Sequence, residues 1–162
     1  MDRVSTSART ILVVEDYEDV RLMLKVLLES EHVRVLEAAT GAEALKAIKR
    51  GRPDLILMDL ALPGFDGLET IRRIRKIDGF QNTPIIVLTA YSAPSIQETA
   101  RRAGTNYFMT KPIDFDELEE LVTQILFDGN RGQKYGRSGA HRAVIGSQTP
   151  VPHLRREVRS RI

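Results

Sequence analysis

Residues 55–59 read Leu-Ile-Leu-Met-Asp, so four apolar residues run directly into one carboxylate. An uninterrupted apolar run of this length is typical of a strand that is buried on both faces of a parallel sheet. Three other apolar runs lead to polar residues in the same way: residues 11–14 to Glu15 and Asp16, residues 85–88 to Thr89, and residues 107–109 through Thr110 to Lys111. The sequence thus places polar residues after each of four expected strands.

The first 127 residues alternate between strand-like and helix-like segments, which predicts an α/β fold. We expect strands at residues 10–14, 33–37, 54–58, 84–88 and 106–109. Apolar residues at helical spacing fill the intervals, and those of the first expected helix, which should face the core, are Val20, Met23, Leu24, Leu27 and Leu28. Five strands alternating with five helices predict a doubly wound parallel sheet with right-handed crossovers.

The carboxyl ends of parallel strands meet at one edge of the sheet, where ligands bind in such folds. Glu15, Asp16 and Asp59 should therefore lie close together. Like charges at short range repel unless a cation holds them, and carboxylates are typical ligands of Mg²⁺. An acidic pair such as Glu15 and Asp16 could instead only cap the next helix, but the polar residues at the other strand ends favour a magnesium site.

Asp59 is the candidate nucleophile, because a carboxylate at this point can form an aspartyl-phosphate. Lys111 would add positive charge beside the phosphoryl group, and Thr89 would donate its hydroxyl to a phosphoryl oxygen. Taken alone, Thr89 would be an ordinary strand residue and Lys111 an ordinary surface lysine. The Lys111–Pro112 bond can be cis at modest cost, and the sequence does not decide its isomer.

Charge divides the 162 residues into an acidic domain and a basic tail. Residues 1–128 carry 16 Lys/Arg against 21 Asp/Glu, whereas residues 129–162 carry 8 against 1. We expect an extension at residues 1–8, one domain at residues 9–128, and a mostly disordered tail at residues 129–162. The chain lacks cysteine, a secretory signal and an apolar run long enough to span a membrane, so we expect a cytoplasmic protein without membrane partners.

The five polar residues after these strands together resemble the receiver domain of bacterial two-component response regulators, the chemotaxis-regulator-like family, over about residues 9–128. The resemblance implies a flavodoxin-like sheet of strand order 2-1-3-4-5. It identifies Asp59 as the phosphoacceptor, Lys111 as the site lysine and Thr89 as the switch hydroxyl. It also implies that Mg²⁺ is bound by Glu15, Asp16, Asp59 and the backbone carbonyl of Ala61, and that Phe108 is the switch aromatic residue.

The function that this resemblance implies is that of a stand-alone receiver, a signalling protein and not an enzyme beyond its own phosphotransfer and dephosphorylation. A sensor histidine kinase or a histidine phosphotransfer protein would donate the phosphoryl group. Leu22 and Val26, which point away from the sheet, would dock that donor, although they could also be scattered surface residues. Phosphorylation would move Thr89, draw the Phe108 ring inward and reshape the face made by the fourth helix, fifth strand and fifth helix, which an unidentified downstream protein would recognise.

Some residues depart from the family pattern. Ala61 is small and Tyr91 is bulky, and these two positions should tune the lifetime of the phosphorylated state. A magnesium-dependent phosphatase on a similar sheet would need a carboxylate two residues after the nucleophile, where Ala61 stands. Two alternatives stay open: a phosphorelay intermediate, and a regulator whose basic tail touches nucleic acid, although basic residues alone are weak evidence for the latter.

Overall fold

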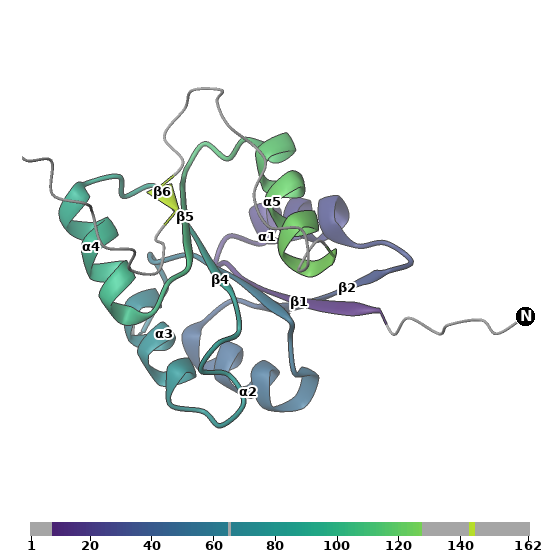
Figure 1. The fold of residues 1–162 in the computed structure, drawn as a ribbon, viewed down its shortest axis with the longest axis horizontal. Helices are drawn as coiled ribbons and strands as arrows, with labels where there is room; N and C mark the ends of the chain where they lie inside the picture. The colour runs from purple at the N-terminus through teal and green to yellow at the C-terminus, as the bar shows by residue number, and fades with distance from the viewer. Residues whose placement is uncertain (1–7, 65, 128–142, 145–162) are drawn as a thin grey trace, which may run out of the picture.

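The computed structural model describes residues 8–64, 66–127 and 143–144. Strands and helices alternate through them (Figure 1), in the order β1 (Arg9–Val14), α1 (Glu18–Leu28), β2 (Val33–Ala38), α2 (Gly41–Gly51), β3 (Leu55–Met58), α3 (Gly67–Arg75), β4 (Ile85–Thr89), α4 (Pro94–Ala103), β5 (Tyr107–Thr110), α5 (Phe115–Phe127) and β6 (Ala143–Val144). Each expected strand is present, with bounds shifted by no more than one residue.

The sheet confirms the predicted architecture. Five parallel strands lie in the order β2-β1-β3-β4-β5, and five helices connect or follow them. The structure adds β6, which pairs antiparallel with the outer side of β5. Its two residues belong to the segment expected to be mostly disordered, and the other residues of that segment lie outside the described residues, as does most of the N-terminal extension.

Helices cover both faces of the sheet, which explains the uninterrupted apolar runs. In Figure 1, α1 and α5 lie on one side and α2, α3 and α4 on the other. Successive strand residues point to opposite faces, so Ile11 and Val13 pack toward α1 and α5, whereas Leu12 and Val14 pack toward α2 and α3. Odd- and even-numbered residues of the inner strands β1, β3 and β4 are therefore both buried, so apolar side chains are favoured at every position.

One residue in the middle of α1 departs from the predicted apolar face. Leu24 and Leu28 are buried as expected, but Met23 is 43% exposed. It lies beyond the edge of the narrow stripe that contacts the sheet, because each residue advances about 100° around a helix. Leu22 and Val26 are 54% and 72% exposed and point away from the sheet, so with Met23 they form an apolar patch on α1.

Side-chain caps fix where several helices begin. Thr40 and Asp66 accept hydrogen bonds from Glu43 N–H and Glu69 N–H at the starts of α2 and α3. Asp114 caps α5 by accepting from Glu117 N–H at 3.1 Å. Each cap contributes about 1 kcal/mol to helix stability.

The amino end of the sheet is closed around one half-buried cation, Arg75. Its five N–H groups reach neutral oxygens only: the carbonyls of Phe80, Thr83 and Gly104, the last of them twice, and Asn106 Oδ1, at 2.7–3.0 Å. Burial lowers the pKa of the guanidinium below its ordinary value. Arg75 thereby ties the end of α3 to the segments that precede β4 and β5.

No helix among the described residues combines the length and the apolar composition that a membrane span requires.

Candidate functional site

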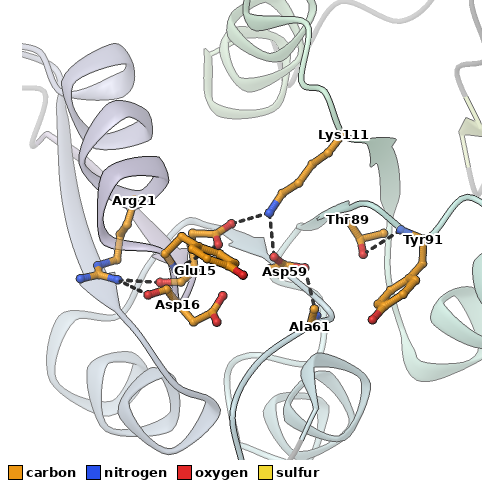
Figure 2. Close-up of polar contacts among 9 residues, drawn as sticks. Glu15, Asp16, Arg21, Asp59, Ala61, Thr89, Tyr91 and Lys111 are labelled. Carbon is orange, nitrogen blue, oxygen red and sulfur yellow. Dashed lines mark hydrogen bonds and ion pairs between the residues drawn. The ribbon is translucent and has the colours of Figure 1, made fainter.

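The carboxyl end of the sheet gathers the polar residues that the sequence singled out. Glu15 and Asp16 follow β1, Asp59 follows β3, Thr89 is the last residue of β4, and Lys111 follows β5. Figure 2 shows Asp59 at the centre, with Lys111 reaching over it, Glu15 and Asp16 on one side, and Thr89 with Tyr91 on the other. The parallel strands therefore bring together residues that are up to 96 positions apart.

Asp59 is buried, with 4% of its surface exposed, and three hydrogen bonds hold it in place. Its backbone N–H donates to Val14 O at 2.9 Å. Its Oδ1 accepts from Ala61 N–H at 3.0 Å, and its Oδ2 accepts from Lys111 Nζ at 2.7 Å. Both carboxylate oxygens thus have a defined orientation, and the group faces the other acids of the site.

Gly67 allows the backbone around Asp59 to pack closely against the start of α3. A Cβ at this position would lie 2.2 Å from Asp59 O and 2.7 Å from Leu60 Cα. Gly67 N–H also donates to Leu60 O at 3.1 Å. Any side chain here would therefore displace the segment that carries Asp59.

Lys111 bridges two of the carboxylates. Its Nζ lies 2.7 Å from Glu15 Oε2 and 2.7 Å from Asp59 Oδ2. Burial alone would lower the pKa of the ammonium, but its hydrogen bonds to Asp59 and Glu15 outweigh burial and raise the pKa. Lys111 therefore stays charged. Its own N–H donates to Thr89 O at 2.9 Å, and the Lys111–Pro112 bond is cis.

Glu15 is buried, with 1% of its surface exposed. Burial raises the pKa of its carboxyl, the ammonium of Lys111 partly offsets that rise, and the nearby charge of Asp59 adds to it. Its Oε1 accepts from Tyr17 N–H at 3.2 Å. A carboxylate in this position carries an electrostatic cost that the single lysine does not remove.

The three acids fit a hard divalent cation. One oxygen from each of Glu15, Asp16 and Asp59 lies within 4.8 Å of the others. Three carboxylates and one ammonium leave two negative charges. Asp16 Oδ1 is buried and has no hydrogen-bond partner among the described residues, an arrangement that normally costs about 1–3 kcal/mol. Oxygen ligands around a site of charge −2 are the donor set that Mg²⁺ prefers.

Arg21 was missed by the sequence analysis. Its guanidinium donates to the backbone carbonyls of Glu15, at 2.7 Å, and Asp16, at 3.3 Å, and so orients the loop that carries both acids (Figure 2). Because backbone carbonyls exist at every position, no residue pattern marks such a contact. The available signal was an arginine one turn into the helix that follows the acidic pair.

Thr89 and Phe108 are both buried, at 0% and 4% exposed. The Thr89 hydroxyl accepts from Tyr91 N–H at 3.3 Å, which leaves its own O–H free to donate to another group. The Phe108 ring already packs in the core on the side of α2, α3 and α4. The ring is therefore buried in this structure, and its movement on phosphorylation stays a prediction. Leu22 and Val26 lie on α1 and contribute nothing to the site itself.

Comparison with known proteins agrees with this geometry. The family model described as the response regulator receiver domain matches residues 11–123. Sporulation initiation phosphotransferase F of Bacillus subtilis (strain 168) is 34% identical over 116 residues, which cover 72% of this chain and 92% of that protein. A putative response regulator from Chloroflexus aurantiacus J-10-fl superposes with a TM-score of 0.69 at 35% identity, over 74% of this chain and 98% of that one.

A second solved structure contains a metal. The receiver domain of the sensor histidine kinase PA1611 from Pseudomonas aeruginosa PAO1 has a magnesium ion coordinated in its active-site cleft. It is 34% identical, with a TM-score of 0.66, over 73% of this chain and 97% of that one. Sheet order, site geometry and sequence similarity thus lead to one assignment: the chain belongs to the response regulator receiver domain family of two-component signalling.

Proposed function

We propose that Asp59 accepts a phosphoryl group from the phosphohistidine of a sensor histidine kinase or a histidine phosphotransfer protein. The observation that carries this proposal is the fixed, buried carboxylate of Asp59, held by Ala61 N–H on one oxygen and by Lys111 Nζ on the other. A nucleophile that is already oriented loses little entropy on reaching the transition state. The relative named sporulation initiation phosphotransferase F supports the same class of reaction.

In the proposed step, an oxygen of Asp59 attacks phosphorus, the phosphorus–nitrogen bond breaks, and the imidazole of the donor leaves. Lys111 Nζ, now 2.7 Å from Asp59 Oδ2, stays beside the acceptor and balances charge on the phosphoryl oxygens. The Thr89 hydroxyl donates its O–H to one of those oxygens. The product is an aspartyl-phosphate enclosed between Lys111 and Thr89.

The residues that would hold Mg²⁺ are Glu15, Asp16 and Asp59, together with the backbone carbonyl of Ala61. Two observations support this assignment: the buried Asp16 Oδ1 has no hydrogen-bond partner in the part of the chain that the structure describes, and the site has net negative charge. The magnesium ion in the PA1611 receiver domain supports it too. A bound Mg²⁺ would neutralise charge on the transferring group. In this account Glu15 and Asp16 have no role in proton transfer and serve only as ligands.

The experiment that tests the acceptor replaces Asp59 with Asn, which keeps the size and an acceptor oxygen. The wild-type protein, incubated with acetyl phosphate and Mg²⁺, should gain the mass of one phosphoryl group, and Asp59→Asn should gain none. Asp54→Asn is the matched control, because Asp54 pairs with Arg9 at the amino end of the sheet, away from the site. Full incorporation into Asp59→Asn would reject this acceptor.

The phosphohistidine donor would dock on the apolar patch of α1. Leu22 and Val26 are exposed on the helix that follows the acidic pair, so a protein bound there lies beside the site. Replacing both with Ser should slow transfer from the cognate phosphohistidine protein about tenfold, the effect of losing about 1.4 kcal/mol of binding. Transfer from acetyl phosphate should not change. Equal slowing with both donors would contradict docking at this patch.

Phosphorylation would reach the rest of the molecule through Thr89. Because its hydroxyl now accepts from Tyr91 N–H, turning toward a phosphoryl oxygen would alter that bond and release the loop before α4. We infer that output proceeds from there to the face formed by α4, β5 and α5. The amide resonance of Tyr91 should shift on phosphorylation in the wild-type protein and not in Thr89→Ala. An unchanged Tyr91 resonance in the phosphorylated wild type would contradict this route.

A further inference from the structure

The two outer strands of the parallel sheet are protected differently. The outer strand β2 carries the exposed charged residues Arg34 and Glu37, and Val33 also pairs with Ser30 through two backbone hydrogen bonds. The strand β5 reads Tyr-Phe-Met-Thr and carries no charge. Although β5 has only four residues, an edge strand without charged side chains can still pair with a strand of another chain. The β5 edge is thus the one that requires a cover.

That cover is present in the structure. β6, residues Ala143–Val144, pairs antiparallel with β5, with Tyr107 opposite Val144 and Phe108 opposite Ala143. Figure 1 shows it against β5 on the side away from β4. Only 15 residues separate Phe127 from Ala143. A segment tethered this closely is presented at an effective concentration on the order of millimolar, which favours it over a second copy at micromolar concentration.

The backbone of Phe108 faces β6. Ile56 N–H donates to Pro84 O, so the even-numbered residues of β4 face β3 and the odd-numbered ones, including Val87, face β5. Val87 lies opposite Phe108. In a parallel pair, a residue that faces the partner strand bonds to the two neighbours of the residue opposite it. Val87 therefore bonds to Tyr107 and Met109, and not to Phe108. The N–H and C=O of Phe108 therefore point to the other side, toward Ala143.

We propose that the C-terminal segment at residues 143–144 is a tethered cap on the edge of β5. It occupies the backbone groups of Phe108 and prevents β5 from pairing with a strand of a second copy. A partner that adds an extended segment to this edge has to displace the cap. The proposal concerns the edge alone and does not depend on phosphorylation of Asp59.

Hydrogen exchange in the full-length protein tests the cap. Ala143→Pro removes the N–H that faces Phe108, and Ala143→Ser is the matched control because it keeps that N–H. The Phe108 amide should be protected in the wild type and in Ala143→Ser, and should exchange at least about tenfold faster in Ala143→Pro. The Met109 amide, which faces β4, should stay protected in all three and shows that the fold is intact.

Two results would overturn the proposal. One is a Phe108 amide that exchanges without protection in the wild type. The other is protection that survives unchanged in Ala143→Pro. Light scattering tests the protective role: the mean mass of Ala143→Pro should rise with concentration above that of Ala143→Ser. Equal masses at every concentration would show that the segment does not guard the edge.

Discussion

The two ends of the sheet treat buried charge in opposite ways. At the amino end, the five N–H groups of Arg75 all reach neutral oxygens. At the carboxyl end, one ammonium contacts two of three clustered carboxylates, and burial raises the pKa of Glu15. Among the described residues, Asp16 Oδ1 has no hydrogen-bond partner. The first arrangement is complete within the protein. The second leaves negative charge uncompensated among the described residues, which is what we expect of a site that binds a cation.

The largest effect on stability should come from the amino end. Arg75→Met leaves the carbonyls of Phe80, Thr83 and Gly104 without their donor, and we expect a loss of about 3 kcal/mol in the free energy of unfolding. Urea denaturation measures this loss. Arg75→Lys is the matched variant, and it should recover only part of the loss because an ammonium cannot reproduce the planar fork. Full recovery would mean that charge, and not geometry, holds this end together.

Gly104 provides a second test of the packing around Arg75. Its φ is +109°, and an added Cβ would lie 2.9 Å from Arg75 Cγ and Nε. Gly104→Ala should therefore cost about 2–3 kcal/mol, from backbone strain and displacement of Arg75 together. Gly64→Ala is the control: φ is +85° and nothing lies within 4 Å of the added Cβ, so strain acts alone. If the two variants lose equal stability in thermal denaturation, the contact with Arg75 is unimportant.

At the carboxyl end, removing charge should raise stability. Asp16→Asn deletes one of three clustered carboxylates and keeps the size of the side chain. Without Mg²⁺ the free energy of unfolding of the variant should exceed that of the wild type by about 0.5–1 kcal/mol, because functional sites commonly reduce stability. Chemical denaturation in the presence of a chelator measures the difference. A clear loss of stability would indicate that Asp16 is a structural residue, like Arg75.

The smallest effect concerns pH. Because burial raises the pKa of Glu15, the folded protein binds this proton more tightly than the unfolded chain does. The contribution of Glu15 to stability should therefore be greatest below the unfolded pKa of 4.5 and fall as the pH rises through the folded pKa. As the pH rises over this range without Mg²⁺, the wild type should lose stability and Glu15→Gln should not. The free energy of unfolding of the variant should therefore increase relative to that of the wild type. A difference independent of pH would contradict the raised pKa.

Much of the fold and the site could be predicted because their signals lie in side chains. Apolar runs that end in Glu15, Asp59 and Thr89 indicate both the buried parallel strands and the edge where they converge. Arg75 carries no such signal: in the sequence it belongs to a basic cluster with Arg72, Arg73 and Lys76. Its partners are three backbone carbonyls and one amide oxygen, and contacts of this kind depend on the folded path of the chain.

Other differences have similar causes. Met23 has helical spacing with the core residues of α1 but falls outside the stripe that contacts the sheet. β6 is only two residues long and pairs with β5, and a run this short gives no strand pattern in the sequence. Phe108 was expected to move between an outward and an inward position, and the structure shows the buried one.

The most direct test of the account is a calorimetric titration of Mg²⁺ into the wild-type protein, Asp16→Asn and Arg75→Lys. We expect saturable binding of one ion to the wild type, undiminished binding to folded Arg75→Lys, and at least about tenfold weaker binding to Asp16→Asn. Absence of saturable binding to the wild type, or equal affinity in Asp16→Asn, would contradict the claim that the carboxyl end of the sheet is completed by a divalent cation.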